Sequence, residues 1–402
     1  MNASIMIEPA QDAISTGETP AAVDWPLIGR VALKAAVLFL LLNAVFAAIR
    51  PLDALGRLSL YNVAYPGRLR LPYGEIPAED YNLTLNNLPA MFAAHTLARP
   101  PAADEFRVLL IGDSATWGWF LANDDTLAGQ LNALDLRVAD GRRVVVHNLG
   151  YPVMSLTKDL LLLDEALART EADLILWPVT LQSFARGRQQ EHPLLHENAG
   201  RVRDLIGRYD LSLDPADSRF VDRGFTQETL VGRRRDLADL LRLQAWGMAW
   251  AATGRDQAIP AEIPARTDDL KADESWLDVA EERPLTKDDL AFEVLRAGLA
   301  RAADVPVILI NEPMFIANGV NANGVNANGV NGDIRYNTFY PRWAYDQYRQ
   351  MLAGAAAAEG WRYLDLWDAI PPEEFTDTPV HLTPEGSRQF AALLANAFVG
   401  SE

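Results

Sequence analysis

The sequence predicts an α/β fold in which a parallel sheet carries helices on both faces. Short apolar runs bounded by charged residues or turn signals recur along the chain, and their lack of polar alternation is typical of strands buried on both faces. Helical patterns separate these runs, which is the order that builds parallel strand-helix-strand units. The first run, 107–111, ends at Gly112, and a serine follows where a helix can begin.

Five strands are predicted, with helical segments between them. The strands are 108–111, 143–147, 174–177, 305–310 and 362–366, and the helices are 125–134 with Asp124 as N-cap, 156–169 and 384–397. Right-handed crossovers bring the loops after such strands to one edge of the sheet, where open α/β sheets bind ligands. The polar residues expected to meet there are Ser114, Gly150, Gln182 and Asn311-Glu312-Pro313.

Length and composition narrow the possible functions. A chain of 402 residues can form one large or two ordinary domains. A net charge of −18 disfavours nucleic acid and anionic membrane surfaces as general partners. The sequence has no cysteine, which excludes disulfides, thiolate zinc sites and cysteine nucleophiles. No cofactor and no metal site is expected.

The N-terminal part divides into a polar tail and an apolar segment. Residues 1–24 lack periodicity, and we expect them to be disordered. Between Lys34 and Arg50 only Asn43 is polar, which leaves about fifteen residues of hydrocarbon-compatible helix. That is short of the ~20 residues that span a bilayer, but snorkelling of the two flanking cations extends the reach. We interpret 25–50 as a single-pass membrane anchor.

Two alternatives to a membrane anchor remain open. A cleaved signal peptide is one, because Val45-Phe46-Ala47 resembles a small-residue cleavage site. A buried amphipathic helix is the other, although the apolar character runs all round the segment. The basic residues that flank the segment would by themselves leave the C-terminal part inside the cytoplasm.

Ser114 is the candidate nucleophile. A serine at the carboxyl end of a buried strand has backbone N–H groups nearby that can stabilise an oxyanion, but it can equally be the N-cap of the next helix. A nucleophilic serine needs a base, and the base needs a group that orients it. His381, which follows Asp377 and precedes the helix 384–397, supplies such a pair.

These segments together resemble the SGNH hydrolases, also called GDSL-type esterases. The resemblance is carried by Ile111-Gly112-Asp113-Ser114, by the glycine of His147-Asn148-Leu149-Gly150, and by the acid-to-histidine element followed by Leu-Thr-Pro-Glu-Gly, in the family's order over the last three-quarters of the chain. It implies that Ser114 is the nucleophile and that the last block supplies aspartate and histidine. It also implies an oxyanion hole made of the Ser114 and Gly150 amides and a third-block asparagine side chain.

The chain departs from the family pattern in two places. Asp377 lies four residues before His381 instead of the usual three, and Thr378 occupies the usual place. The third block lacks its Gly-x-Asn-Asp ending, and the asparagine's place falls on Gln182. A glutamine amide can serve as the donor from a longer stem, or it can be an ordinary polar residue after the strand.

Domain boundaries follow from composition. After the anchor we expect a juxtamembrane segment, 51–105, and an SGNH-type hydrolase domain, 106–400. An insertion at about 185–285 should form a helical cap over the strand edge, with Trp246 and Trp250 lining a pocket or packing in the cap core. The repeats in 318–331 predict a surface loop. The aromatic residues of 336–343 are a substrate platform or part of the core.

The sequence therefore predicts a membrane-anchored serine esterase. The expected substrates are acyl esters, most simply O-acetyl groups, on cell-envelope glycans. An O-acyltransferase would use the same residues, and a glycan-binding or assembly protein without catalysis would explain the two departures. Envelope-anchored SGNH proteins carry the catalytic domain outside the cytoplasm, and the resemblance implies the same side here. The acyl group and the oligomeric state cannot be read from the sequence.

Overall fold

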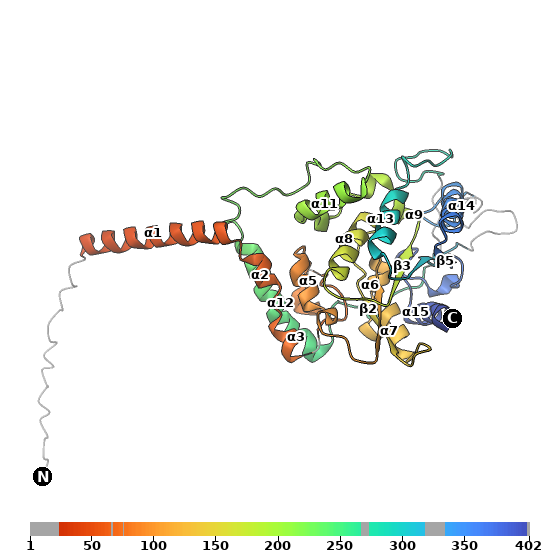
Figure 1. The fold of residues 1–402 in the computed structure, drawn as a ribbon, viewed down its shortest axis with the longest axis horizontal. Coiled ribbons are helices and arrows are strands. Elements are labelled where there is room, and N and C mark those ends of the chain that lie inside the picture. Colours follow the sequence, from red (N-terminus) through yellow and green to blue (C-terminus); the bar gives the residue numbers. More distant parts are fainter. Residues whose placement is uncertain (1–23, 66, 75, 267–272, 318–333, 400–402) are drawn as a thin grey trace, which may run out of the picture.

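The protein is described by a computed structural model that covers residues 24–65, 67–74, 76–266, 273–317 and 334–399 (Figure 1). The predicted tail, except Asp24, and the predicted repeat loop lie outside the described residues.

The centre of the body is a five-stranded parallel sheet. Its strands are β1 (Glu105–Leu110), β2 (Arg143–Asn148), β3 (Leu174–Val179), β4 (Val307–Asn311) and β5 (Arg362–Asp365), and they lie in the order β2-β1-β3-β4-β5. This is the doubly wound, flavodoxin-like order, so the predicted fold class is confirmed. β1 begins earlier than predicted because Glu105 to Arg107 pair with Arg143 to Val145 of β2.

Helices cover both faces of the sheet (Figure 1). One face carries α8 (Leu156–Leu167), α13 (Phe292–Ala302) and α14 (Arg342–Glu359), and the other carries α7 (Leu127–Ala133) and α15 (Pro384–Val399). Alternate strand residues face the two layers: Leu109 and Ile175 pack in the first core, and Val108 and Leu110 in the second. The inner strands β1, β3 and β4 are therefore apolar on both sides, which explains their apolar runs, whereas the edge strand β5 is partly exposed.

The predicted N-cap of α7 is wrong. Asn123–Asp125 form the short 3-10 helix η2, and α7 begins after Thr126, whose Oγ1 accepts a hydrogen bond from the Gly129 amide at 3.1 Å. Thr126 is buried, so its hydroxyl satisfies an amide at a helix end that water does not reach.

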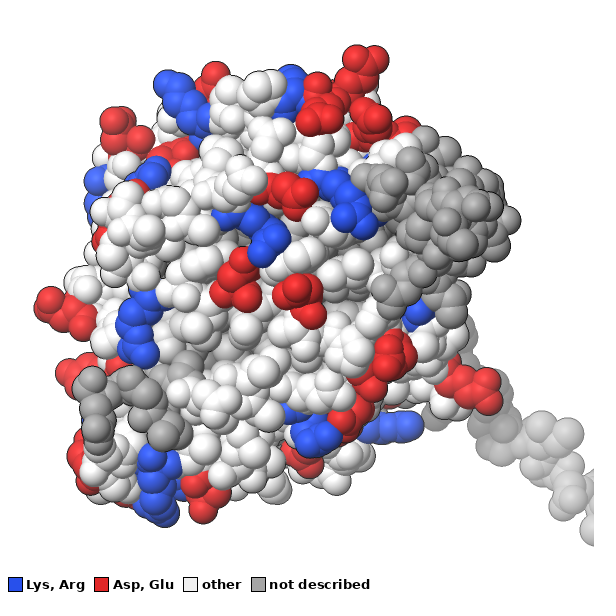
Figure 2. All heavy atoms as spheres, turned by 90° about the vertical axis from the view of Figure 1, so that its right-hand side faces the viewer, with Lys and Arg blue, Asp and Glu red and all other residues white. Residues whose placement is uncertain are grey.

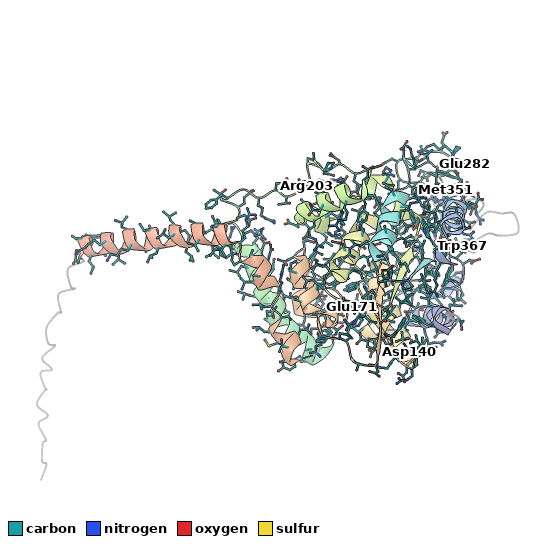
Figure 3. All side chains as sticks on the ribbon, viewed as in Figure 1. Asp140, Glu171, Arg203, Glu282, Met351 and Trp367 are labelled. Carbon is teal, nitrogen blue, oxygen red and sulfur yellow. The ribbon has the colours of Figure 1, made fainter. Side chains whose placement is uncertain are left out.

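Helix α1 (Trp25–Ile49) projects from the body as one continuous helix (Figures 1 and 3). Its 25 residues span about 38 Å, more than the ~30 Å hydrocarbon core of a bilayer. It is long and apolar enough to cross a membrane, criteria that a signal sequence also meets. Only Asn43 and Ala47 are buried, so the buried-helix alternative is wrong.

Short helices join α1 to the sheet, follow β1, β3 and β5, and form part of the insertion. They are α2 (Leu52–Gly56), α3 (Leu60–Ala64), α4 (Pro77–Asp80), α5 (Leu88–Ala94), η1 (Thr96–Ala98), α6 (Ser114–Trp117), α9 (Leu181–Phe184), η3 (Arg186–Arg188), α10 (Pro193–Glu197), α11 (Ala199–Tyr209) and η4 (Pro372–Glu374). Helix α5 is buried almost throughout, and it links the segment after α1 to α8.

The long helix of the insertion, α12 (Arg234–Thr253), does not cover the strand edge as the predicted cap would. It packs on α2, α3 and α5 instead. Its buried Trp250 lies against the Arg68 guanidinium, 5.8 Å from the ring centroid, so this tryptophan belongs to the packing between α12 and the segment after α1. The part of the insertion that reaches the strand edge is the segment after α12.

Candidate active site

The carboxyl edge of the sheet brings four distant parts of the chain together. Ser114 follows β1, Gln182 follows β3, and Glu312 follows β4. The loop that carries Asp377 and His381 comes from the segment between β5 and α15. The convergence predicted from strand order is therefore present.

Ser114 is the first residue of α6, not its N-cap. Asp113 is the N-cap, and its Oδ1 accepts a hydrogen bond from the Ala115 amide at 2.8 Å. The capping role that competed with catalysis is thus filled by another residue, which leaves the hydroxyl of Ser114 free for a different partner.

That partner is His381. Nε2 of His381 lies 2.9 Å from Oγ of Ser114, and Nδ1 lies 2.8 Å from Oδ1 of Asp377. A carboxylate only accepts, so Nδ1 donates to Asp377 and Nε2 accepts the serine proton. The three side chains form one hydrogen-bonded row with the direction that general-base activation requires.

The extra residue between Asp377 and His381 is absorbed by a closed loop. An antiparallel bridge pairs Phe375 with Leu382, and the Thr376 amide donates to the carbonyl of His381 at 2.9 Å. Thr378, at the family's aspartate position, accepts a hydrogen bond from the His381 amide at 3.2 Å. The hydroxyl therefore holds the backbone of the histidine while Asp377 reaches its ring.

Asp377 is ionised in this arrangement. Burial by itself would raise the pKa of this carboxyl, but the hydrogen bond and charge of His381 outweigh it and lower the pKa below its usual 3.8. An ionised Asp377 favours a proton on Nδ1 of His381, which leaves Nε2 as the acceptor.

Gly150 lies beside α6, but its amide is occupied. A Cβ at Gly150 would come within 2.5 Å of the Trp117 nitrogen, so only glycine fits against this turn. The amide donates to Oδ1 of Asn148 at 3.0 Å, and Asn148 in turn donates to the Thr116 carbonyl at 2.9 Å. Gly150 and Asn148 together support the turn that carries Ser114.

Val153, on the same loop, has an unusual backbone. Its φ is +74°, a conformation that costs a β-branched residue strain, and strain of this kind concentrates at functional sites. The loop passes the end of β1, because the Tyr151 amide donates to the carbonyl of Gly112 at 3.0 Å. No acceptor among the described residues binds the Val153 amide. Sequence reasoning missed this residue, since a valine gives no turn signal.

Gln182 lies in the first turn of α9, directly after β3 and half-buried. The capping role at this turn is filled by Thr180, whose hydroxyl donates to the Tyr340 hydroxyl at 3.0 Å. Within the described part of the chain, no partner is recorded for the Gln182 side-chain amide.

Lys158 supports the serine turn from below, and sequence reasoning missed it. Its fully buried Nζ donates to the carbonyls of Gly112 at 2.8 Å and Tyr151 at 2.6 Å. It also forms an ion pair with Asp159 at 2.8 Å. The available signal was this charged pair directly before the four leucines of α8.

Glu312 is a buried carboxyl beneath the same edge. Burial, with the nearby charges of Asp113 and Asp159, raises the pKa of Glu312 well above 4.5. Its Oε1 has no hydrogen-bond partner among the described residues. Burial and these charges therefore favour the protonated form of Glu312.

Trp119 forms a wall beside the histidine. Its ring stacks on His381 with centroids 6.1 Å apart and planes 28° apart, and it is half-exposed. The loop that carries it is held by Gln257, which accepts from the Phe120 amide at 2.8 Å and donates to the carbonyls of Gly118 and Leu121. Gln257 belongs to the insertion, four residues after α12.

The aromatic residues after the repeats belong to the core instead of a platform. Tyr336, Tyr340 and Trp343 are all buried. In the described ranges, no group of three or more His, Asp or Glu side chains is placed to hold a metal ion.

Comparisons with known proteins give only distant similarities. No family model and no curated protein matches the chain. Solved structures that it resembles include a carbohydrate acetylesterase from Sinorhizobium meliloti (12% identity, 72% of this chain and 97% of that one, TM-score 0.30). Others are an aryl esterase from M. smegmatis (13%, 72% and 97%, 0.31) and an acetylxylan esterase mutant from Geobacillus stearothermophilus (13%, 75% and 99%, 0.33). Similarities this weak do not indicate an activity, so any assignment of function depends on the geometry of the site.

Proposed function

We propose that the chain is a membrane-anchored serine esterase of SGNH type that acts on acyl esters. The single observation that carries the proposal is the hydrogen-bonded row from Ser114 through His381 to Asp377. This arrangement of a serine, a buried histidine and an orienting carboxylate is the one that activates a nucleophile, and neither a surface role nor a capping role for the serine requires it.

In the proposed reaction, Oγ of Ser114 attacks the ester carbonyl carbon while Nε2 of His381 takes the hydroxyl proton. The tetrahedral intermediate expels the alcohol, which leaves with that proton, and the acyl group stays on Ser114. Water then attacks the acyl-enzyme with His381 as base, and the carboxylic acid is released. Asp377 stabilises the imidazolium in both steps.

The developing oxyanion needs donors aimed at it. The Ser114 amide at the start of α6 and the Gln182 side chain are proposed donors, since no acceptor among the described residues binds either. The Gly150 amide would serve only by leaving Asn148. We therefore add the Val153 amide as the proposed donor from that loop.

The anchor, the domain limits and the substrate class are parts of the same proposal. Helix α1 would hold the chain in a membrane within the segment 25–50, with 51–105 as the juxtamembrane segment and 106–400 as the catalytic domain outside the cytoplasm. The half-exposed Trp119 ring beside His381 suits a sugar ring that carries the acyl group, so O-acetylated envelope glycans are the proposed substrates.

The test is fluorophosphonate labelling of the full chain in detergent, with p-nitrophenyl acetate turnover measured on the same samples. Ser114→Ala should abolish labelling and lower turnover by roughly 10⁴-fold or more. Ser218→Ala, at an exposed serine, is the matched control and should change neither. If folded wild-type protein neither labels nor turns over the ester, Ser114 is not activated and the proposal fails.

A further inference from the structure

Large apolar side chains are exposed along α2, α3 and α12, beside exposed charged residues such as Asp53, Arg234 and Arg242. Between α2 and α3, Leu58 is 58% exposed, and in α3 Leu60 and Val63 are 74% and 87% exposed. On α12, Leu241 and Met248 are 65% and 52% exposed. We call this surface the α2–α3–α12 layer.

The pattern on α12 shows that the exposure is organised. Leu240, Leu243, Gly247 and Trp250 form its buried face. The exposed residues Leu241, Ala245, Met248 and Ala252 follow helical spacing and form a second apolar stripe. A helix at a water-facing surface normally carries polar residues on that stripe, so this helix is apolar on two sides.

One side chain joins the stripe to the residues before α3. Gln244 of α12 accepts a hydrogen bond from the Leu60 amide at 2.8 Å and donates to the Leu58 carbonyl at 3.3 Å. The exposed leucines of both segments therefore lie on one continuous surface.

The layer lies on the side of the body from which α1 projects (Figure 1). Only Arg50 and Pro51 separate α1 from α2. A second contact holds the C-terminal part of α1 against the body: Oδ1 of Asn43 accepts a hydrogen bond from the Val231 amide at 3.0 Å. Val231 is itself exposed, and exposed Phe225 precedes it in the segment before α12, so apolar side chains are exposed near this contact as well.

The opposite side of the body is different. Figure 2 shows acidic and basic side chains scattered over that face, as expected of a surface in water. On α12 the exposed Arg242 accompanies the apolar stripe, and the acidic residues beside it are paired, Asp239 with Arg242 and Asp236 with Arg233. Apolar residues with accompanying arginines are typical of helices that lie in a bilayer interface.

We propose that the α2–α3–α12 layer lies in the headgroup region of the bilayer that α1 crosses. The layer would then hold the body against the membrane at two places, the helix and the flat surface beside it. This inference rests on the membrane anchoring proposed above and adds to it a surface that a simple tether does not need.

The absence of cysteine makes a direct test possible. Single cysteines at Val63, Leu241 and Met248 of the full chain would carry a nitroxide label, with the chain in nanodiscs of phosphatidylethanolamine and phosphatidylglycerol. Leu40→Cys, in α1, is the lipid reference, and Glu282→Cys, on the side away from α1 (Figure 3), is the water reference. Retained turnover of p-nitrophenyl acetate shows that each labelled protein is folded.

The expected result is a shift in collision rates at the three layer positions. Relative to Glu282→Cys, collisions with oxygen should rise and collisions with a water-soluble nickel complex should fall, because oxygen concentrates in lipid. If the collision rates at all three positions equal those of Glu282→Cys while Leu40→Cys shows lipid-like rates, the inference is overturned and the anchor stays supported. Protection from both reagents would mean a protein partner, which also overturns it. A water-like Leu40→Cys would overturn the anchor and the layer together.

Discussion

The carboxyl edge of the sheet and the α2–α3–α12 layer depart from the usual distribution of residues in opposite directions. At the edge, ionisable groups such as Lys158 and His381 are buried. In the layer, large apolar groups such as Val63 and Leu241 are exposed. Buried polar groups and exposed apolar patches are the informative exceptions in a soluble protein.

The buried ionisable groups at the edge and the exposed apolar groups of the layer are stabilised in different ways. A buried charge is costly unless hydrogen bonds compensate it, and Lys158 has two carbonyls and a carboxylate within the protein. An exposed apolar side chain needs no bond, only a medium other than water. The edge can therefore be tested by removing single partners, and the layer by changing the medium.

The largest effect on the edge, after loss of the nucleophile, should come from Asp377→Asn. An amide can donate to Nδ1 of His381, which selects the wrong tautomer and leaves Ser114 without a base. We expect kcat for ester hydrolysis to fall about 10⁴-fold. The circular dichroism spectrum should match that of the wild type, which shows that the fold is unchanged. Asp140→Asn, at an exposed aspartate, is the control. An Asp377→Asn enzyme of nearly full activity would assign the orienting role to another carboxylate.

Gln182→Ala should have the next largest effect. Loss of one oxyanion donor costs about 10²–10³ in kcat, while substrate binding changes little because the donor acts on the intermediate. Steady-state kinetics measure both quantities, and Gln130→Ala, at a glutamine of α7, serves as the matched control. A change in kcat below about twofold would remove Gln182 from the oxyanion hole.

Glu312→Gln should change the pH dependence of stability. The native state keeps a proton on Glu312 that the unfolded chain loses above pH 4.5, so the wild-type free energy of unfolding falls as the pH rises from 4.5 toward the raised native pKa. The variant lacks this fall, which can reach about 1.4 kcal/mol per pH unit. Urea unfolding over a pH series measures the slope, and exposed Glu281→Gln should retain the wild-type slope. Equal slopes in wild type and Glu312→Gln would mean that Glu312 is ionised in the native state.

The smallest effect is expected from Val153→Gly. Glycine adopts a φ of +74° without the ~1–2 kcal/mol that an L-residue loses there, but it adds ~0.5–1 kcal/mol of chain entropy to lose. The free energy of unfolding should stay level or rise by up to about 1.5 kcal/mol, with activity retained because the amide remains. Val221→Gly, at a residue with negative φ, should instead lose stability. A loss in Val153→Gly as large as in Val221→Gly would argue against strain.

The sequence predicted the sheet, the five strands and the residues at its edge, because the inner strands are apolar on both faces and polar residues follow them directly. It also indicated Ser114, His381 and Asp377, whose proposed roles await the tests above. The extra residue before His381 could not be judged from spacing, since the Phe375 to Leu382 bridge that absorbs it is a tertiary feature.

What the sequence could not show depended on contacts across the fold. Asn148 occupies the Gly150 amide, a competition that no linear pattern encodes. The length and helical pattern of the insertion predicted a cap over the strand edge. Its long helix α12 packs instead on α2, α3 and α5, which lie in the segment after α1. The N-cap of α7 moved from Asp124 to Thr126 because the intervening residues form a 3-10 turn.

The end of α12 joins the two regions compared above. Gly254 ends the helix in a left-handed conformation, and after Arg255 the chain reaches Asp256, which is salt-bridged to the buried Arg70. Arg70 donates to the Gly118 carbonyl at 2.8 Å, at the base of the loop that carries Trp119. A continuous set of bonds therefore runs from the end of α12 to the loop that forms the wall beside His381, so the position of that wall depends on residues at the end of α12.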